Sequence, residues 1–197
     1  MRRVHIRLLA VVYCLIAPVT LAHPSEQVHA LSPTLMAALP ALHLTNALLT
    51  SLPDSVRIKM LAAIARGDIA GAITLWQLAT GRTDVPAALS ALESAFAVAN
   101  RVAGPCVQVA KNISEGFKFL GGNPQFVRLS SSQGQFLSWQ GRTLMSDNNL
   151  HVAVRMEDKI YDAFTGPAGM VQAEYLKNLV VRGTPSIQQI AGEALTP

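Results

Sequence analysis

The stretch from residue 148 to residue 166, NNLHVAVRMEDKIYDAFTG, has the pattern of a β-hairpin. Alternating residues lead into a charged turn at Glu157-Asp158, and a second short run follows the turn. Two polar side chains stand inside this pattern: His151 opens the first run and Asp162 lies within the second. The hairpin itself needs neither an imidazole nor a carboxylate, so their relative position decides whether they have a joint role.

The register of the hairpin decides which side chains share a face. With the turn placed there, Ala153 lies opposite Asp162 and His151 lies opposite Phe164. His151 and Asp162 are then diagonal neighbours on one face, and such neighbours are about 7–8 Å apart at Cα. A register shifted by one residue would put them on opposite faces. The sequence therefore predicts that the histidine and the aspartate lie within reach of each other.

The elements around the hairpin predict an α+β fold. Residues 104–122, GPCVQVAKNISEGFKFLGG, predict a helix, because apolar residues recur on one stripe at spacings of three and four. The next stretches, QFVRLSS, GQFLSWQG and GRTLMS, are rich in β-forming residues with glycine and serine between them. After the hairpin, GPAGMVQAEYLKNLVVRG predicts a turn and a closing helix, and the chain beyond Thr184 indicates no clear element. One helix followed by antiparallel strands is an α+β plan.

The first half of the chain is almost wholly helical in pattern. Proline, glycine and aspartate signals separate four segments rich in alanine and leucine, at 31–52, 54–67, 69–81 and 87–104. They predict an all-α N-terminal region at residues 23–99, ahead of a catalytic domain at residues 100–197. His43 lies between leucines, and we interpret it as a packing residue. The first segment is apolar enough to touch a membrane, but it lacks a basic face, so we favour core packing over membrane contact.

Residues 1–22, MRRVHIRLLAVVYCLIAPVTLA, have the pattern of a secretory signal peptide. A basic start, a short apolar centre and small residues before the cleavage point follow one another. The apolar centre is short for a membrane span and Pro18 interrupts it, which argues against an uncleaved anchor. We therefore expect export to the periplasm or the exterior, with cleavage after Ala22. Ala17 and Ala30 are the alternative cleavage sites.

Removal of this segment changes both the charge and the cysteine content. The formal net charge falls from +4 to +1, because three arginines and no acidic residue leave with it. No basic cluster with interleaved aromatic residues remains in the sequence, which argues against nucleic acid as a partner. Cys14 also leaves, so Cys106 has no intramolecular partner. A single thiol in an oxidising compartment is a dimer bridge, an inert buried residue or a nucleophile.

The residues around Cys106 allow it to be a nucleophile. Gly104 and Pro105 precede it, and proline is favoured at the first helical position. Cys106 then lies in the first turn, where free N–H groups and the helix dipole stabilise a thiolate and offer donors to an oxyanion. The alternative is a small buried residue on the apolar stripe of the helix, and position alone leaves both open.

A nucleophilic thiol needs a base, and the base needs an acceptor on its other nitrogen. Cys106, His151 and Asp162 supply these three roles in that order along the chain. The alternative for the hairpin pair is a histidine and an aspartate on a solvated strand face.

Short motifs in the second half also resemble a known family. A cysteine at a helix start, GGNPQFVRL, the HVAV strand, and YDAFTG followed by EYLKNL are similar to the papain-like fold. The resemblance covers about residues 100–182 and is closest to the papain-fold toxin domains of bacterial polymorphic toxins and secreted effectors. It implies a catalytic triad with Cys106 as nucleophile, His151 as base and Asp162 as orienting residue. Papain-like proteases also carry an oxyanion glutamine a few residues before the cysteine, and here Asn100 is the nearest amide.

These features together predict an exported toxin or effector that acts as a cysteine hydrolase, either a protease or a glutamine deamidase. We expect a papain-like core of α+β class behind the helical region, without a cofactor and without a metal, since the short ligand spacings of zinc sites do not occur in the sequence. The expected partners are a protein substrate and a cognate immunity protein. The alternatives are a periplasmic cell-wall amidase of similar fold and a non-enzymatic helical interaction protein.

Overall fold

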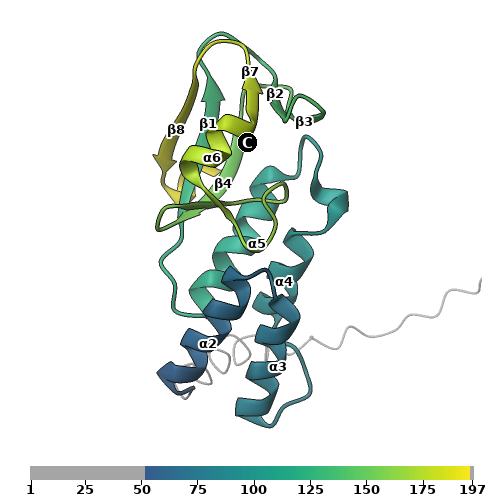
Figure 1. Cartoon of the computed structure of the whole chain (residues 1–197), viewed down its shortest axis with the longest axis vertical. Coiled ribbons are helices and arrows are strands. Elements are labelled where there is room, and N and C mark those ends of the chain that lie inside the picture. Colours follow the sequence, from purple (N-terminus) through teal and green to yellow (C-terminus); the bar gives the residue numbers. More distant parts are fainter. Residues whose placement is uncertain (1–51, 196–197) are drawn as a thin grey trace, which may run out of the picture. The chain divides into compact units, whose positions relative to one another are not determined.

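The computed structural model describes residues 52–195. The expected signal peptide with its cleavage site after Ala22, the thiol of Cys14, His43 and nearly all of the first expected helix lie outside the described residues. Within them, helices and antiparallel sheets combine, which confirms the α+β class that the sequence predicts (Figure 1).

Three helices open the described part of the chain: α2 (Asp54–Ala65), α3 (Ile69–Thr80) and α4 (Ala87–Ala95). The predicted start and stop of α3 are confirmed. The carboxylate of Asp68 accepts a hydrogen bond of 2.7 Å from the N–H of Gly71, and Gly81 ends the helix with a φ of 68°. Local capping signals therefore define these boundaries.

The fourth predicted helix is shorter than its pattern indicates. α4 ends at Ala95, and a single 3-10 turn, η1 (Val98–Asn100), follows it. The side-chain amide of Asn100 donates to the carbonyl oxygens of Ser94 and Ala95, at 2.9 and 3.3 Å. These are carbonyl groups that a longer helix would have used for its own hydrogen bonds. The amide therefore closes α4 early, which a pattern of apolar residues does not indicate.

The helix that begins at Cys106 and the hairpin form as predicted. α5 (Cys106–Phe119) begins directly after Pro105. β4 (His151–Met156) and β5 (Lys159–Tyr161) pair antiparallel with Met156 opposite Lys159 and Val154 opposite Tyr161, which is the predicted register. One detail of the prediction is wrong: β5 ends at Tyr161, so Asp162 is the first residue of the following turn rather than a strand residue.

Two antiparallel sheets hold the remaining strands. The first is five-stranded, in the order β6-β5-β4-β1-β8, and the second is three-stranded, in the order β3-β2-β7. Their other members and the last helices are β1 (Gln125–Ser131), β2 (Leu137–Trp139), β3 (Thr143–Ser146), β6 (Met170–Val171), α6 (Gln172–Asn178), β7 (Leu179–Val181), β8 (Pro185–Ile190) and η2 (Gly192–Leu195). β8 lies beyond Thr184, where the sequence pattern indicates no element, and it forms an edge strand beside β1.

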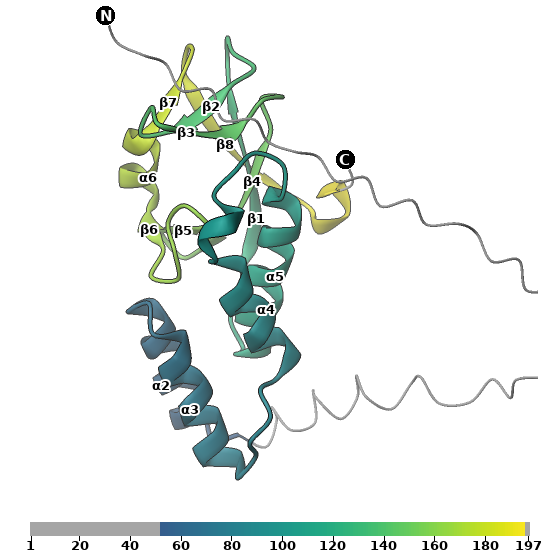
Figure 2. The same ribbon diagram turned by 90° about the vertical axis from the view of Figure 1, so that its right-hand side faces the viewer.

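The residues of β4 divide the core between the two faces of the larger sheet. Val152 and Val154 pack with the helices α2 to α5, whereas Ala153 packs with residues of β2, β7 and α6. Successive residues of a strand point to opposite faces, which explains this alternation. Figure 2 shows α5 running beside β4, in agreement with their contacts. His151 therefore opens a strand that separates two hydrophobic clusters.

The N-terminal helices and α5 share one of these clusters. Leu89 and Leu92 of α4 are fully buried in it together with Phe117 of α5. The approach is close, because a Cβ added at Gly116 would lie 2.7 Å from the Cβ of Leu92. The domain boundary predicted after residue 99 stays a prediction, but the described helices on both sides of it pack into the same core.

Candidate active site

Cys106 stands at the start of α5, as the sequence predicts. Gly104 turns the chain with a φ of 112°, a value at which glycine carries no steric cost. Pro105 occupies the cap position, and Cys106 is the first residue of the helix. Its thiol is free, and the residue is half-buried. This placement puts the thiol among the free N–H groups of the first helical turn.

His151 is held by the start of β4. It pairs with Leu129 of β1 and is only 2 % exposed. Just before it, Asn149 continues the ladder with its side chain: its oxygen accepts from the N–H of Ser131 at 2.6 Å, and its nitrogen donates to the Ser131 carbonyl at 2.9 Å. Asn149 has a φ of 60°, a conformation that asparagine tolerates better than most residues. The backbone that carries the imidazole is thus fixed on both sides of His151.

Asp162 is locked in a reciprocal turn. Its Oδ1 accepts from the backbone N–H groups of Phe164 and Thr165, both at 2.9 Å, and the Thr165 hydroxyl accepts from the N–H of Asp162 at 3.0 Å. The same exchange of side-chain and backbone bonds occurs in the capping box of helices. The spacing of aspartate and threonine in YDAFTG therefore fixes the carboxylate.

The two hairpin side chains meet directly. His151 Nε2 and Asp162 Oδ2 are 2.9 Å apart, and both residues are almost completely buried. The hydroxyl of Tyr175, from α6, donates to the same Oδ2 at 2.6 Å. With two donors on each oxygen, the carboxylate has all its acceptor positions filled. This arrangement excludes a solvated strand face, which was the alternative for the pair.

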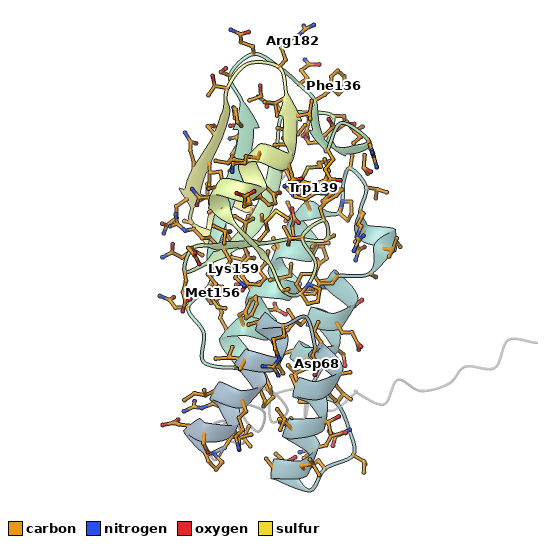
Figure 3. The ribbon with its side chains drawn as sticks, viewed as in Figure 1. Asp68, Phe136, Trp139, Met156, Lys159 and Arg182 are labelled. Carbon is orange, nitrogen blue, oxygen red and sulfur yellow. The ribbon has the colours of Figure 1, made fainter. Side chains whose placement is uncertain are left out.

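Aromatic rings surround this hydrogen bond. The ring of Phe164 meets the imidazole of His151 edge to face, with centroids 5.9 Å apart. Trp139 of β2, labelled in Figure 3, lies 6.0 Å from Phe164 and 5.2 Å from Tyr175 between ring centroids. Such an apolar surround lowers the local dielectric constant, which strengthens the interaction between imidazole and carboxylate.

The other ring nitrogen of His151 has no such partner. Nδ1 is buried, and none of the residues from 52 to 195 forms a hydrogen bond with it. A buried polar atom without a partner is rare in folded proteins and is often functional. No hydrogen bond of ordinary geometry joins it to Cys106, yet the two groups lie close enough to change each other's pKa. Catalytic contacts are commonly long before a substrate is bound.

The pKa of each group follows from these neighbours. Partial burial alone would raise the pKa of the Cys106 thiol, but His151, and then the backbone N–H groups of Val152 and Val107, bring the pKa below its usual value. Burial alone would lower the pKa of His151, whereas Asp162 and Cys106 raise it to about 9. For Asp162, the penalty of burial is overcome by His151 and Tyr175, which lower its pKa. The favoured state at neutral pH is an imidazolium between a carboxylate and a thiol with increased thiolate content.

Asn100 has a different position from the one predicted. Its amide nitrogen donates to two carbonyl groups at the end of α4, so both donors have a structural role. An oxyanion donor must keep an N–H directed at the reacting carbonyl oxygen. The oxyanion role predicted for Asn100 is therefore without support. The backbone N–H of Val107, which acts on the sulfur of Cys106, is the better placed donor.

Sequence reasoning missed Tyr175, Thr165 and Trp139. Thr165 had a local signal, since an aspartate followed by threonine three positions later is typical of a reciprocal turn. Tyr175 and Trp139 had no local signal, because they belong to other elements, α6 and β2, which the tertiary fold brings to the site. Contacts of this kind do not follow from spacing along one element.

Other kinds of site have little support in the described residues. Residues 52–195 hold no group of three histidine, cysteine or acidic side chains placed to bind a metal. The helices in this part of the chain are too short or too polar to cross a membrane. Two cavities of about 770 and 670 Å³ lie elsewhere on the described residues, and Cys106, His151 and Asp162 line neither of them.

Comparisons with models of protein families, with curated proteins and with solved structures find no match for this chain.

Proposed function

We propose that this protein is a cysteine-dependent hydrolase of amides, with Cys106 as nucleophile, His151 as proton shuttle and Asp162 as orienting residue. One observation carries the proposal. A buried histidine is held by a carboxylate through Nε2, its Nδ1 has no hydrogen bond of ordinary geometry, and the half-buried thiol at a helix start lies close enough to change the pKa of the histidine. Nucleophile, base and orienting group in this order are the requirements of covalent acyl transfer.

The chemistry has two halves. The Cys106 thiolate attacks the acyl carbon, a C–S bond forms, and the carbonyl electron pair moves to oxygen, where backbone N–H groups of the first turn stabilise the charge. His151 gives its Nδ1 proton to the departing nitrogen as the C–N bond breaks, which leaves a thioester. The neutral imidazole then takes a proton from water, the resulting hydroxide attacks the thioester, and the carboxylic acid leaves as the thiolate re-forms.

The resemblance to papain-fold toxin domains supports a protein substrate, and the pattern of residues 1–22 supports export. We therefore propose an exported toxin or effector that acts as a protease or a glutamine deamidase, with a cognate immunity protein in the producing cell. A periplasmic cell-wall amidase would use the same three residues on another amide. A purely helical interaction protein would have no use for a buried His151–Asp162 pair beside a thiol.

The test is a product analysis. The full chain is incubated with a mixed peptide library that includes glutamine peptides, and separately with peptidoglycan fragments, and mass spectrometry reads the products. Shortened peptides identify a protease, amide-to-acid conversion identifies a deamidase, and released stem peptides identify an amidase.

Cys106→Ala and His151→Ala are expected to reduce product formation by at least about 100-fold. Asp158→Ala alters a carboxylate in the nearby hairpin turn and is the matched control, expected to keep activity. Absence of any Cys106-dependent product from all substrates would overturn the proposal.

A further inference from the structure

Tyr175 has an unusual position for a buried tyrosine. Its side chain is completely buried, and its hydroxyl donates a hydrogen bond of 2.6 Å to Asp162 Oδ2. The same oxygen accepts from His151 Nε2, whereas Oδ1 is occupied by two backbone N–H groups. The phenol and the imidazole therefore share one negatively charged acceptor atom, Asp162 Oδ2.

We propose that Tyr175 is a positioning residue that shares Asp162 Oδ2 with His151 and so limits how strongly Asp162 holds the imidazolium. This inference rests on the proposed function, because the proton affinity of His151 matters only if His151 gains and loses a proton during the reaction. It adds a fourth residue to the predicted Cys106–His151–Asp162 set.

The physical reason is the sharing of charge. A hydrogen-bond donor stabilises a carboxylate and makes it a weaker acceptor for any other donor. If Asp162 interacted with His151 alone, it would be a more basic carboxylate in an apolar surround, and the imidazolium would be harder to deprotonate. The Tyr175 hydroxyl reduces this basicity, so His151 releases its Nδ1 proton more readily. That release is the step in which the leaving nitrogen is protonated.

The hydroxyl can be separated from the ring. The ring of Tyr175 lies in the hydrophobic cluster of the two sheets and packs 5.2 Å from Trp139 between centroids. Phenylalanine keeps this packing and removes only the donor. Four titratable groups face one another here: Cys106 from α5, His151 from β4, Asp162 from the turn and Tyr175 from α6. Arg101 lies beside this group, where its Nε donates to the carbonyl of Ala163 at 3.0 Å.

The sign of the effect follows. Tyr175→Phe makes Asp162 a stronger acceptor, so the pKa of His151 rises. At low pH the imidazolium is fully formed in both proteins, so the change appears where His151 loses its proton, and the imidazolium beside the Cys106 thiolate persists to higher pH. The basic limb of the pH profile of Cys106 reactivity is expected to move upward by about half a pH unit. Tyr161 offers a matched control, since it is also buried, at 3 % exposure, and its ring rests on Phe117 rather than on the site.

The experiment measures alkylation of Cys106 in the full chain by iodoacetamide as a function of pH, with the labelled peptide identified by mass spectrometry. Tyr175→Phe is expected to shift the basic limb upward, and Tyr161→Phe to leave it in place. If Tyr175→Phe does not fold, replacement of tyrosine by 3-fluorotyrosine provides a stronger donor and is expected to shift the limb downward. An unchanged limb in a folded Tyr175→Phe protein, or in the fluorotyrosine protein, would overturn the inference.

Alkylation needs no substrate, so a shift without any hydrolase product would leave the inference standing while the proposed function fails. If the substrate test gave Cys106-dependent products but Tyr175→Phe left the limb unchanged, the inference about Tyr175 would fail and the proposed function would stand.

Discussion

At the scale of single residues, the contrast between Asp162 and His151 is the main feature of the site. Asp162 accepts four hydrogen bonds, from His151, Tyr175 and two backbone N–H groups. His151 has one nitrogen tied to this carboxylate and the other free of any described partner. The carboxylate fixes the imidazole, and the nitrogen that lacks a hydrogen bond of ordinary geometry is the one that moves a proton in the proposed mechanism.

The raised pKa of His151 predicts a pH dependence of stability. A group whose pKa is higher in the folded protein stabilises the fold fully below its unfolded pKa, and this contribution is lost as the pH rises through the folded pKa. For His151 the window extends from the ordinary value of 6.5 to about 9. In Cys106→Ala, which removes the titration of the thiol, only Asp162 still raises the pKa of His151, so urea unfolding is expected to show a loss on the order of 1 kcal/mol as the pH rises above 6.5. The Cys106→Ala/His151→Gln protein should show no such loss. If the free energy of unfolding depended on pH equally in the two proteins, the assignment to His151 would be refuted.

At the scale of elements, the hairpin and the turn after it explain how the pair is built. The register of β4 and β5 was predictable because a two-residue turn fixes it locally, and Val154 does lie opposite Tyr161. The exit of Asp162 from the strand was also within reach of the sequence, through Thr165. The early end of α4 at Ala95 depends on the side chain of Asn100, which a pattern of apolar residues does not report. The strand β8 and the approach of Tyr175 were not predictable either, because each depends on contacts with residues far away in the sequence.

Thr165→Val tests the turn. The change keeps the side-chain volume but removes the hydroxyl that accepts from the N–H of Asp162. That N–H then loses its partner, which costs about 1–3 kcal/mol in free energy of unfolding. Alkylation of Cys106 at mildly acidic pH is also expected to slow, since the carboxylate is held less firmly. Thr74→Val is the control, because the Thr74 hydroxyl bonds a helix carbonyl at an exposed position of α3. Equal effects of the two substitutions would contradict the role given to Thr165.

At the scale of the whole described unit, the helical residues support the site from one face of the larger sheet. α4 packs on α5, and Val152 and Val154 of β4 join the same cluster (Figure 2). α5 carries Cys106 at its start, so a shift of α4 against α5 would move the thiol relative to His151. The described helices before residue 99 therefore share a hydrophobic cluster with the helix that carries the thiol.

Gly116→Ala tests this coupling. Alanine favours a helix by roughly 1 kcal/mol over glycine, but its Cβ would lie 2.7 Å from the Cβ of Leu92. Overpacking of this kind costs about 1–3 kcal/mol, so chemical denaturation should show a net loss of stability. Leu92→Ala in the same chain keeps the Leu92 Cβ but removes its Cγ and Cδ2, each 3.0 Å from the added Cβ, which gives α4 room to readjust. The two substitutions together are therefore expected to cost less than the sum of the single ones. Strict additivity would contradict a tight contact between α4 and α5.

The rate at which iodoacetamide alkylates Cys106 at about pH 6 tests the central claim most directly, because an ordinary thiol with a pKa near 8.5 is almost unreactive there. If Cys106, His151 and Asp162 act as one coupled set, the wild-type protein reacts rapidly, and His151→Ala slows the reaction by at least about 10-fold. Asp162→Ala slows it less, and Asp158→Ala leaves it unchanged. A wild-type Cys106 that reacts like a free cysteine at this pH, at a rate that His151→Ala does not alter, would contradict the account.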